Sequence, residues 1–492
     1  MKKLYITTTL PYVNAEPHIA HAIEFVLADA IARYYKARLS DDNVYFNVGT
    51  DEHGQKIWDK SKSENLDIHE FTKKYSDRFK EFCTSFDVEY SFFYRTSKDY
   101  HYPVATAFWN EAMKNGDIYK KKYKGLYCVG CESFKLDKDL IDGKCPDHGT
   151  EPIELEEENY FFKLTKYREH IADYLQTEFV IPESDRKFAQ EFIKNIEDIS
   201  ISRDKAKLSW GIPVPGDDTQ VMYVWFDALS NYLGSLYFGS KSIDDHFDIT
   251  DVRDLREEFY FLQLCGADNV RFQAIIWQAM LISSKIKFTD KLLVHSWILG
   301  SDGRKMSKTL GNVISPFEQL EKYGSEAVRF FFLACMSTTG NAIYDEAGFV
   351  DQFNSRVADN YGNLLNRVIV LIVKNNIKTS NVTNDNSAIL NEVNQLKNRA
   401  EQKFEEYNIF EYSVIINDIA TLVNKYVTET EPWKKEKPQE FKTDVLLNCF
   451  KALKIITELY KPIIPKTTAK AAYILESLKP EILVAKIARD EN

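Results

Sequence analysis

The chain has 492 residues, of which 44% are hydrophobic and 28% are charged, and its formal net charge is -11. At roughly 150 residues per domain, this length predicts about three domains, and the composition excludes a globally disordered chain. The acidic balance also excludes an indiscriminate nucleic-acid coat, because affinity for phosphate comes from lysine and arginine side chains. Any nucleic acid that binds must therefore meet a local patch.

The sequence predicts neither export nor a membrane span. The first residues, MKKLYITTTLPYVN, lack the long apolar segment of a signal peptide, and no run of about 18 apolar residues predicts a transmembrane helix. The seven cysteines are unevenly placed, with a cluster in residues 128–145, which is not the framework of a secreted disulfide-rich protein. We therefore expect a cytoplasmic protein with no membrane partner.

The N-terminal elements predict the beginning of a parallel sheet. Residues 4–9 have the pattern of a buried strand, residues 18–38 that of a helix, and residues 44–48 that of a second strand, which runs into GTDEHG. A strand, loop, helix, strand order is typical of a parallel α/β sheet. We expect an α/β fold with a Rossmann-like catalytic domain.

The composition changes twice further along the chain. A Gly-, Cys- and Lys-rich segment begins near residue 120, and α/β patterns return in VMYVWFDAL (221–229), EFYFLQLCG (258–266) and KLLVHSWIL (291–299). Strand signals vanish beyond about residue 346, where helical periodicity predicts a bundle. The predicted order is the first half of the Rossmann-like domain at 1–118, an insertion at 119–220 that contains the cysteine cluster, the second half at 221–345 and an α-helical bundle at 346–492.

The first chemical motif is PHIAH (17–21), in which His18 and His21 are three residues apart at the start of a helix. Both imidazoles then share one helical face. The unpaired amides of a helix N-terminus favour a polyphosphate, and two imidazoles add donors. Taken alone, the motif is also compatible with incidental surface histidines or half of a metal site.

The second motif is GRKMSKTLGN (303–312), which follows the last predicted strand. Its two lysines, Lys305 and Lys308, stand in a Gly-flanked segment and could reach a triphosphate. Closing them over the site as charge develops would stabilise the transition state selectively. An exposed lysine pair is otherwise ordinary solvated surface.

Together, the two motifs resemble the paired signatures of class I aminoacyl-tRNA synthetases. Within that class the chain resembles the methionyl-tRNA synthetase family, from LPYVNAEPHIAH through TEPW near residue 433. The stretches that carry the resemblance best are GTDEHGQKI (49–57), SISRDKAKLSWGIPVP (200–215), YVWFDALSNY (223–232) and GRKMSKTLGN.

The resemblance implies a methionine pocket in which Asp51 binds the substrate ammonium. Aromatic faces suit a polarizable thioether, with contacts of about 0.3–1.5 kcal/mol each. Without the other motifs, the same segments would be ordinary core. The other implied pocket residues are Leu10, Tyr12, Trp225, Ala228, Tyr232, Phe272, Gln273 and Trp277.

The implied ATP site includes the two histidines and the two lysines, with Gly266 and Asp268 from QLCGAD (263–268). Several positions depart from the family pattern. Ala20 replaces the usual glycine of the first motif, and Gln263 and Ala267 stand where histidine and lysine are common. Gln273 stands where many relatives have histidine, and Thr309 replaces the final serine of the second motif. Glutamine still offers a donor and an acceptor, so the pocket stays polar. The ATP-binding set is His18, Ala20, His21, Gly266, Asp268, Lys305 and Lys308.

A third motif predicts a structural zinc site. Cys128-x2-Cys131-x13-Cys145-x2-His148 offers three thiolates and one imidazole in two knuckles, the tetrahedral set that Zn(II) prefers. Four protein ligands leave no open position, so the metal would hold a small polar insertion together. Chance clustering or disulfide pairing is the alternative. Single-knuckle methionyl enzymes have this arrangement, which the resemblance places over the tRNA acceptor end.

The predicted bundle supplies candidate RNA contacts. Asn363 and Arg367 are four residues apart on one helical face, and Trp433 lies at a Pro-marked helix start in TEPWKKEKP. Asn and Arg can read splayed base edges, and an exposed Trp can stack on a base. By resemblance, the three residues match the family's readers of the CAU anticodon. Helix-surface hydrogen bonding and a buried Trp anchor are the alternatives.

The implied reaction is ATP-dependent formation of methionyl-adenylate, followed by transfer of methionine to tRNA(Met). The expected catalytic residues are His18, His21, Lys305 and Lys308, with Mg(II) bound to ATP. A class I synthetase for Cys, Leu, Ile or Val, or a non-catalytic tRNA-binding paralogue, remains an alternative. The sequence ends without an evident appended module, so we expect a monomer.

Overall fold

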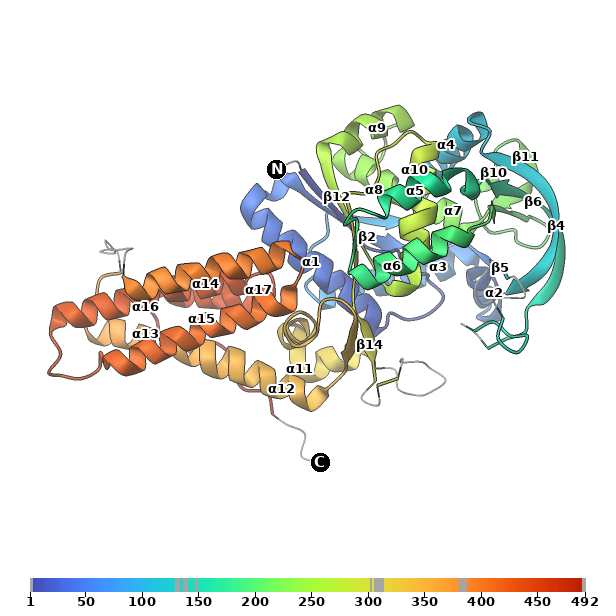
Figure 1. Cartoon of the computed structure of the whole chain (residues 1–492). Coiled ribbons are helices and arrows are strands. Elements are labelled where there is room, and N and C mark those ends of the chain that lie inside the picture. Colours follow the sequence, from blue (N-terminus) through green and yellow to red (C-terminus); the bar gives the residue numbers. More distant parts are fainter. Residues whose placement is uncertain are drawn as a thin grey trace. The chain divides into compact units, whose positions relative to one another are not determined.

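The structure is a computed structural model that describes residues 3–128, 133–135, 140–146, 149–300, 303–304, 314–379 and 387–488. The chain divides into two compact units (Figure 1). The sheet unit comprises Met1–Pro17, Tyr35–Thr84 and Val88–Val294, and the bundle unit comprises His18–Tyr34, Ser85–Asp87 and His295–Asn492. No helix among the described residues is long and apolar enough to cross a membrane.

The sheet unit is built on a six-stranded sheet in the order β3-β2-β1-β12-β13-β7. Every pair of neighbours is parallel, which confirms the predicted Rossmann-like sheet. The central strands are almost wholly buried, as expected for a parallel sheet that is covered on both faces. The strands are β1 (Lys3–Thr7), β2 (Val44–Thr50), β3 (Phe92–Arg95), β7 (Val180–Ile181), β12 (Phe259–Cys265) and β13 (Lys291–Val294).

The direction in which the sheet is extended reverses between β1 and β12. The chain runs from β1 outward through β2 to β3, whereas β12 and β13 extend the sheet on the other side of β1. Ligands of open parallel sheets bind where the order reverses in this way. The helices of this unit are α2 (Gln55–Ser63), α3 (Ile68–Ser85), α4 (His101–Lys114), α5 (Arg168–Tyr174), α6 (Glu183–Phe192), α7 (Val224–Leu229), α8 (Asn231–Ser240), α9 (Ile249–Glu258) and α10 (Trp277–Ser283).

Two small antiparallel sheets lie between α4 and α7 in sequence. In the larger one, β4 and β6 pair along ten positions, and Lys124 and Lys120 make ion pairs of 2.8 Å with Glu154 and Asp217. These two lysines of the segment YKKKYK (119–124) thus pair with carboxylates. Strand β7, within the predicted insertion at 119–220, belongs to the main sheet. The sheets are β5-β4-β6-β8 and β10-β11-β9, with β4 (Ile118–Cys128), β5 (Ser133–Lys135), β6 (Ile153–Phe162), β8 (Ile199–Ser200), β9 (Ser202–Asp204), β10 (Pro213–Val214) and β11 (Asp217–Met222).

The bundle unit is helical beyond residue 346 in its described part, as predicted (Figure 1). A short strand, β15, comes after the GRKMSKTLGN segment in the chain and pairs with β14, which comes before it. The expectation that this segment follows the last strand was therefore wrong. A three-residue strand is too short to show a period-2 pattern. The elements are α1 (Ile19–Leu39, of which the part up to Tyr34 is in this unit), β14 (Trp297–Leu299), α11 (Pro316–Phe330), β15 (Asn341–Ile343), α12 (Glu346–Phe353), α13 (Asn363–Lys374), α14 (Ala388–Glu405), α15 (Ile409–Thr430), α16 (Gln439–Tyr460) and α17 (Pro465–Ser477).

A buried ionic hub fixes α1 within the bundle unit. The fully buried Asp29 carboxylate accepts hydrogen bonds of 2.7 Å from Arg33 and from Arg329 of α11. Arg329 also donates to the carbonyls of Phe86 and Pro462 at 3.0 Å. A buried charge is tolerated only when it is paired and hydrogen-bonded in this way. The helix that follows the PHIAH motif is therefore rigidly held by its surroundings.

Candidate active site

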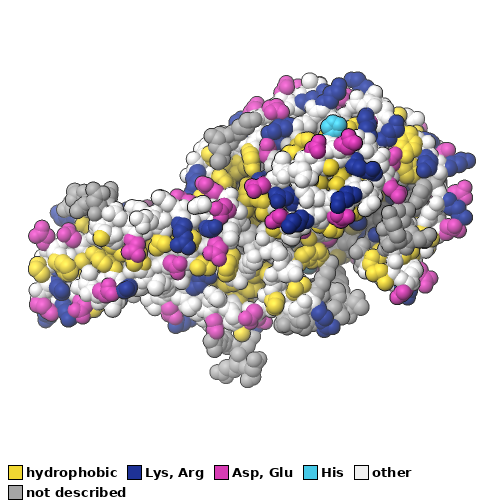
Figure 2. Space-filling view, viewed as in Figure 1, with side chains coloured by type: hydrophobic (Ala, Val, Ile, Leu, Met, Phe, Trp, Pro, Cys, Tyr) yellow, Lys and Arg dark blue, Asp and Glu magenta, His cyan; other side chains and the backbone are white. Residues whose placement is uncertain are grey.

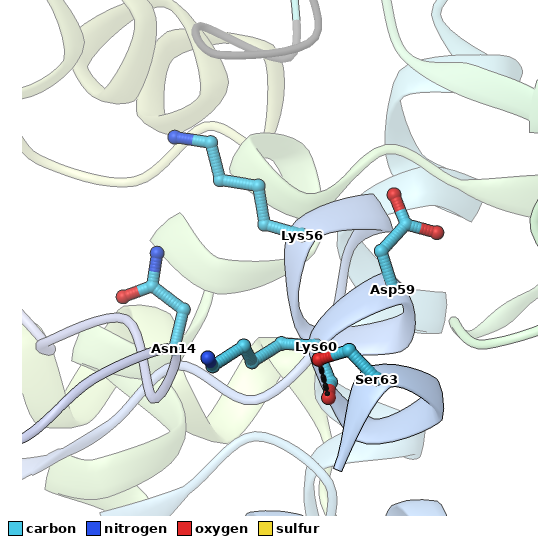
Figure 3. A pocket seen from close by; sticks show the side chains of 5 residues that line it. All are labelled: Asn14, Lys56, Asp59, Lys60 and Ser63. Atoms are coloured by element: carbon cyan, nitrogen blue, oxygen red, sulfur yellow. Dashed lines mark hydrogen bonds between the residues drawn. The ribbon is translucent and has the colours of Figure 1, made fainter. Parts of the chain in front are cut away.

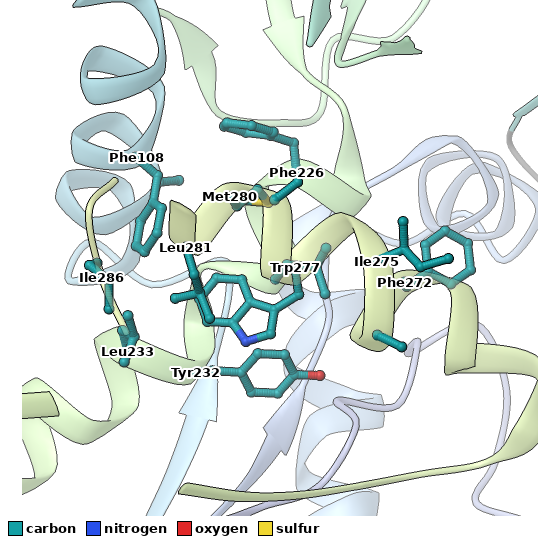
Figure 4. Close-up of a cluster of buried hydrophobic side chains, with 14 of the residues drawn as sticks. Phe108, Phe226, Tyr232, Leu233, Phe272, Ile275, Trp277, Met280, Leu281 and Ile286 are labelled. Atoms are coloured by element: carbon teal, nitrogen blue, oxygen red, sulfur yellow. The ribbon is translucent and has the colours of Figure 1, made fainter. Parts of the chain in front are cut away.

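Aromatic rings from α7, α8, the helical turn Phe272–Ile276 and the start of α10 form a compact group in the sheet unit. The Trp225 and Phe272 rings stack at 3.7 Å between centroids with an angle of 7°. Trp277 is fully buried and lies 5.5 Å from Tyr232 (Figure 4). Leu10, Ala228, Tyr232, Phe272 and Gln273 are also buried, whereas Tyr12 and Trp225 are half-buried.

A chain of amides fixes the polar side of this group. Gln273 donates to the Tyr232 hydroxyl at 2.5 Å and accepts from Gln263 at 3.0 Å. Gln263 in turn accepts from the Thr289 hydroxyl. All four side chains are buried, so each depends on these bonds for its polar atoms. The two glutamines that depart from the family pattern therefore bond to one another and give the pocket an uncharged polar edge.

Asp51 lies directly after β2, at the carboxyl edge of the sheet, with 6% of its surface exposed. Its backbone N–H donates to the Pro11 carbonyl at 2.9 Å, and Val13 donates to the Asp51 carbonyl at 3.2 Å. The Thr96 hydroxyl donates to the carboxylate at 3.4 Å. The loops after β1 and β2 are thus tied together, and a nearly buried carboxylate of this kind is suited to a cationic ligand.

The neighbouring residue, Glu52, anchors the same loop. Arg95 grips its carboxylate with two hydrogen bonds of 2.7 and 3.0 Å, and the Glu52 backbone N–H donates to Thr96 at 2.8 Å. The Trp210 indole donates to the Glu52 carbonyl at 2.6 Å. Sequence reasoning missed these supports. The only signal for these supports in the sequence was the pair of charged residues, Asp51 and Glu52, that follows the buried strand β2.

Gly266 and Asp268 follow β12 at the same carboxyl edge of the sheet. Gly266 precedes the short turn Ala267–Asn269, and Asp268 is exposed, with its carboxylate accepting from Asn269 at 3.4 Å. The structure therefore brings residues from the loops after β1, β2 and β12 to one edge of one sheet, as expected for a ligand crevice. An exposed carboxylate at this edge can accept hydrogen bonds from ribose hydroxyls.

His18 and His21, in the bundle unit, stack on one another at 3.7 Å between ring centroids. The His18 backbone N–H donates to Nδ1 of His21 at 3.2 Å. Burial, together with His18 and His295, holds the pKa of His21 well below its usual value of 6.5. His21 is therefore neutral with its proton on Nε2, which leaves an N–H donor for an anionic oxygen. Ala20 is half-buried.

Four predicted site residues, Lys305, Lys308, Cys131 and His148, lie outside the described residues. Cys128 and Cys145 are buried. Among the residues that the structure does describe, no group of three or more possible ligands could hold a metal ion. The Gly149 N–H donates to the Cys145 carbonyl at 2.7 Å, and the Cys145 N–H donates to the carbonyl of Thr150 at 2.9 Å.

Two of the three predicted RNA-binding residues of the bundle unit, Arg367 and Trp433, are in contact. The Arg367 guanidinium lies over the Trp433 ring at 4.6 Å from its centroid, and Trp433 is 41% exposed. Asn363, one turn before Arg367, is exposed and donates to Asp359 at 3.3 Å. On the face shown in Figure 2, basic and acidic side chains are interspersed.

A separate surface cavity of about 390 Å³ lies beside α2. Two ammonium groups, Lys56 and Lys60, face Asn14 from the loop after β1, with Asp59 and Ser63 completing the lining (Figure 3). The lining thus combines two positive side chains with one negative side chain, and the cavity is open to solvent. Such a surface can attract a polar ligand only weakly, because solvent screens it.

Comparisons with known proteins agree on one family. A model of the family described as "tRNA synthetases class I (M)" matches residues 4–154 and 136–369. The methionine–tRNA ligase of Clostridium tetani is 35% identical over 485 residues, which cover 95% of this chain and 73% of that protein. The chloroplastic and mitochondrial methionine–tRNA ligase of Arabidopsis thaliana is 36% identical over 441 residues, covering 87% of this chain and 69% of that protein.

A solved structure gives the same result at the level of the fold. The methionyl-tRNA synthetase of Mycobacterium tuberculosis in complex with methionyl-adenylate superimposes with a TM-score of 0.86 at 29% sequence identity. The match covers 96% of this chain and 93% of that one. Fold and sequence are therefore similar across almost the whole of this chain, which spans about 70% of the length of the two ligases.

Proposed function

Because this chain belongs to the methionyl-tRNA synthetase family of class I tRNA synthetases, we propose that it activates methionine with ATP and transfers it to tRNA(Met). It is an enzyme, a methionine–tRNA ligase. The observation that supports the substrate best is the pocket, where a nearly buried carboxylate accompanies stacked aromatic rings and an uncharged polar edge.

The chemistry of these residues matches the ammonium group and the thioether of methionine. The Asp51 carboxylate would pair with the ammonium group, and the Trp225 and Phe272 rings offer faces to the thioether. Gln273 holds the Tyr232 hydroxyl at the polar edge. None of these groups adds a full charge beside the side chain, so the arrangement disfavours lysine-like or glutamate-like substrates of the same length.

The reaction begins with in-line attack of a methionine carboxylate oxygen on the ATP α-phosphorus, which expels pyrophosphate and leaves methionyl-adenylate. A ribose hydroxyl at the tRNA 3′ end then attacks the adenylate carbonyl and releases AMP. The protein contributes positioning and charge stabilisation. We assign phosphate contacts to the Nε2–H of His21, to His18, and to Lys305 and Lys308, and a ribose contact to Asp268. Mg(II) bound to ATP would neutralise phosphate charge.

Zinc remains a proposal that rests on the sequence. Cys128, Cys131, Cys145 and His148 would hold Zn(II), which would cross-link the insertion. The buried Cys128 and Cys145 thiols are compatible with knuckle ligands. The insertion at 119–220 and the other domain boundaries, a monomeric state and a cytoplasmic location are likewise proposals.

Anticodon recognition is assigned to Asn363, Arg367 and Trp433. The Arg367 guanidinium covers one face of the Trp433 indole, and a splayed anticodon base would stack on the other. Asn363 and Arg367 keep donors within one helical turn of each other, which suits hydrogen bonds to base edges. The exposure of Trp433 supports this assignment over a purely structural anchor.

ATP–pyrophosphate exchange tests the function directly. Methionine should support exchange, whereas cysteine, leucine, isoleucine and valine should support it at least about a hundredfold less well in kcat/KM. Faster exchange with one of those competitors would identify a different class I synthetase. Absence of exchange with retained tRNA binding would identify a non-catalytic paralogue.

A further inference from the structure

A buried carboxylate that the reaction does not use lies within the helix that carries two pocket residues. Asp227 of α7 is fully buried, two positions after Trp225 and immediately before Ala228. It accepts hydrogen bonds from Nδ1 of His53 at 3.0 Å and from Nε2 of His101 at 3.2 Å. Both histidines are buried as well. A carboxylate is costly to bury in an apolar helix, so the ionised Asp227 depends on these two hydrogen bonds.

The protons of this cluster can be assigned from its hydrogen bonds. The buried Tyr94 hydroxyl, whose pKa burial raises well above its usual value, donates to Nδ1 of His101 at 2.9 Å. His101 is neutral, because burial lowers its pKa, and it therefore carries its proton on Nε2, facing Asp227. Burial opposes ionisation of Asp227, but His53 and His101 outweigh it and hold its pKa below the usual range. The centre is a carboxylate that accepts hydrogen bonds from two imidazole rings.

The two histidines connect Asp227 to different parts of the sheet unit. His101 begins α4 and lies against β3 through Tyr94. His53 belongs to the loop after β2, two residues beyond Asp51. The His53 ring is also packed 5.1 Å from Trp210, whose indole fixes the same loop through the carbonyl of Glu52.

The consequence is a direct link between the two sides of the pocket. On one side, the loop that follows β2 presents the Asp51 carboxylate. On the other, α7 presents Trp225 and Ala228. The hydrogen bond from His53 to Asp227 joins the loop to the helix. It therefore sets the separation of the groups that would hold the ammonium and the side chain of one amino acid. An error of about 1 Å in such a separation can lower the rate about a hundredfold.

We propose that the hydrogen bond from His53 to Asp227 sets the spacing between the ammonium site and the side-chain wall of the amino-acid pocket. His53 and Asp227 are then positioning residues for methionine. His101 bonds to the same carboxylate but supports α4, and it has no part in this spacing. The inference rests on the proposed function of the pocket.

Two matched variants separate positioning from stability. His53→Ala and His101→Ala each remove one N–H donor from the same buried carboxylate, and both should lower the melting temperature. Equilibrium binding of labelled methionine should weaken by about tenfold or more in His53→Ala and by less than about threefold in His101→Ala. The KM for ATP in pyrophosphate exchange should change little in either variant.

A second pair of variants does not depend on His53→Ala being folded. Asparagine places an amide N–H near the position of Nδ1, whereas glutamine places it near Nε2. His53→Asn should therefore keep the methionine Kd within about threefold of the unchanged protein, and His53→Gln should raise it about tenfold. Equal affinities for Asn and Gln, or equal losses in the two Ala variants, would overturn the inference. An unchanged protein that does not bind methionine would instead overturn the proposed function.

Discussion

Removal of the Trp433 indole should separate amino-acid activation from tRNA charging. Trp433→Ala would delete the ring on which we propose that an anticodon base stacks. Such stacking is worth about 1–3 kcal/mol per base, so kcat/KM for tRNA charging should fall by about 5- to 150-fold. ATP–pyrophosphate exchange should barely change, because it does not involve tRNA.

The structure also bounds the folding cost of this change. A fully buried Trp loses about 3–5 kcal/mol on truncation to Ala, but Trp433 is 41% exposed, so we expect about 2–3 kcal/mol. Its contact with the Arg367 guanidinium adds about 0.5–1 kcal/mol at such an exposed site. The melting temperature should therefore fall by only a few degrees.

Phe441 offers a matched control in the same bundle. It is 36% exposed, and Lys437 lies 5.0 Å over its ring, so it has a similar exposure and a similar cation contact. Phe441→Ala should lower the melting temperature comparably and leave charging intact. The reasoning would be refuted if the two variants lost charging equally, or if exchange by Trp433→Ala fell together with charging and stability.

Four further outcomes test the site. Asp51→Asn should raise the methionine KM by at least about 30-fold and change the ATP KM little, because a buried charged bond is lost; a normal methionine KM would remove Asp51 from the pocket. His21→Ala should lower the exchange kcat by about 10²–10³ while methionine binding persists, and an unchanged rate would remove it from catalysis. Stability should fall as the pH drops below about 6.5, because the unfolded chain then gains a proton that folded His21, with its lowered pKa, does not; His21→Asn should fall less steeply, measured by denaturant titration. Elemental analysis should find about one zinc per chain, lost in Cys145→Ser, and a variant that retained stoichiometric metal would refute the ligand set.

The fold was predictable where local patterns and topology agree. The strands at β1, β2 and β12 are short apolar runs, and the helix that begins in PHIAH is a mostly apolar segment too long for a strand, so the parallel sheet could be inferred without coordinates. The segment VMYVWFDAL was less clear. It forms the end of β11 and the six-residue α7, and a run of this length does not distinguish strand from helix by periodicity.

The supports of the site were not predictable in the same way. Gln263, Gln273 and Tyr232 are adjacent in space but are separated by 10 and 41 residues along the chain, so no local pattern joins them. Asp227 gave one signal, an acidic residue inside an apolar run, but nothing in the sequence identifies His53 as its partner. Long-range hydrogen bonds of this kind follow from the completed fold.

The most direct test of the central claim is the charging of tRNA(Met) by the full chain. Radiolabelled methionine should become attached to tRNA(Met) only when ATP is present, with AMP and pyrophosphate released in equal amounts. Replacement of the CAU anticodon should reduce kcat/KM by orders of magnitude. Failure to charge tRNA(Met) with methionine under conditions in which the protein is folded, or preferential attachment of another amino acid, would contradict the account.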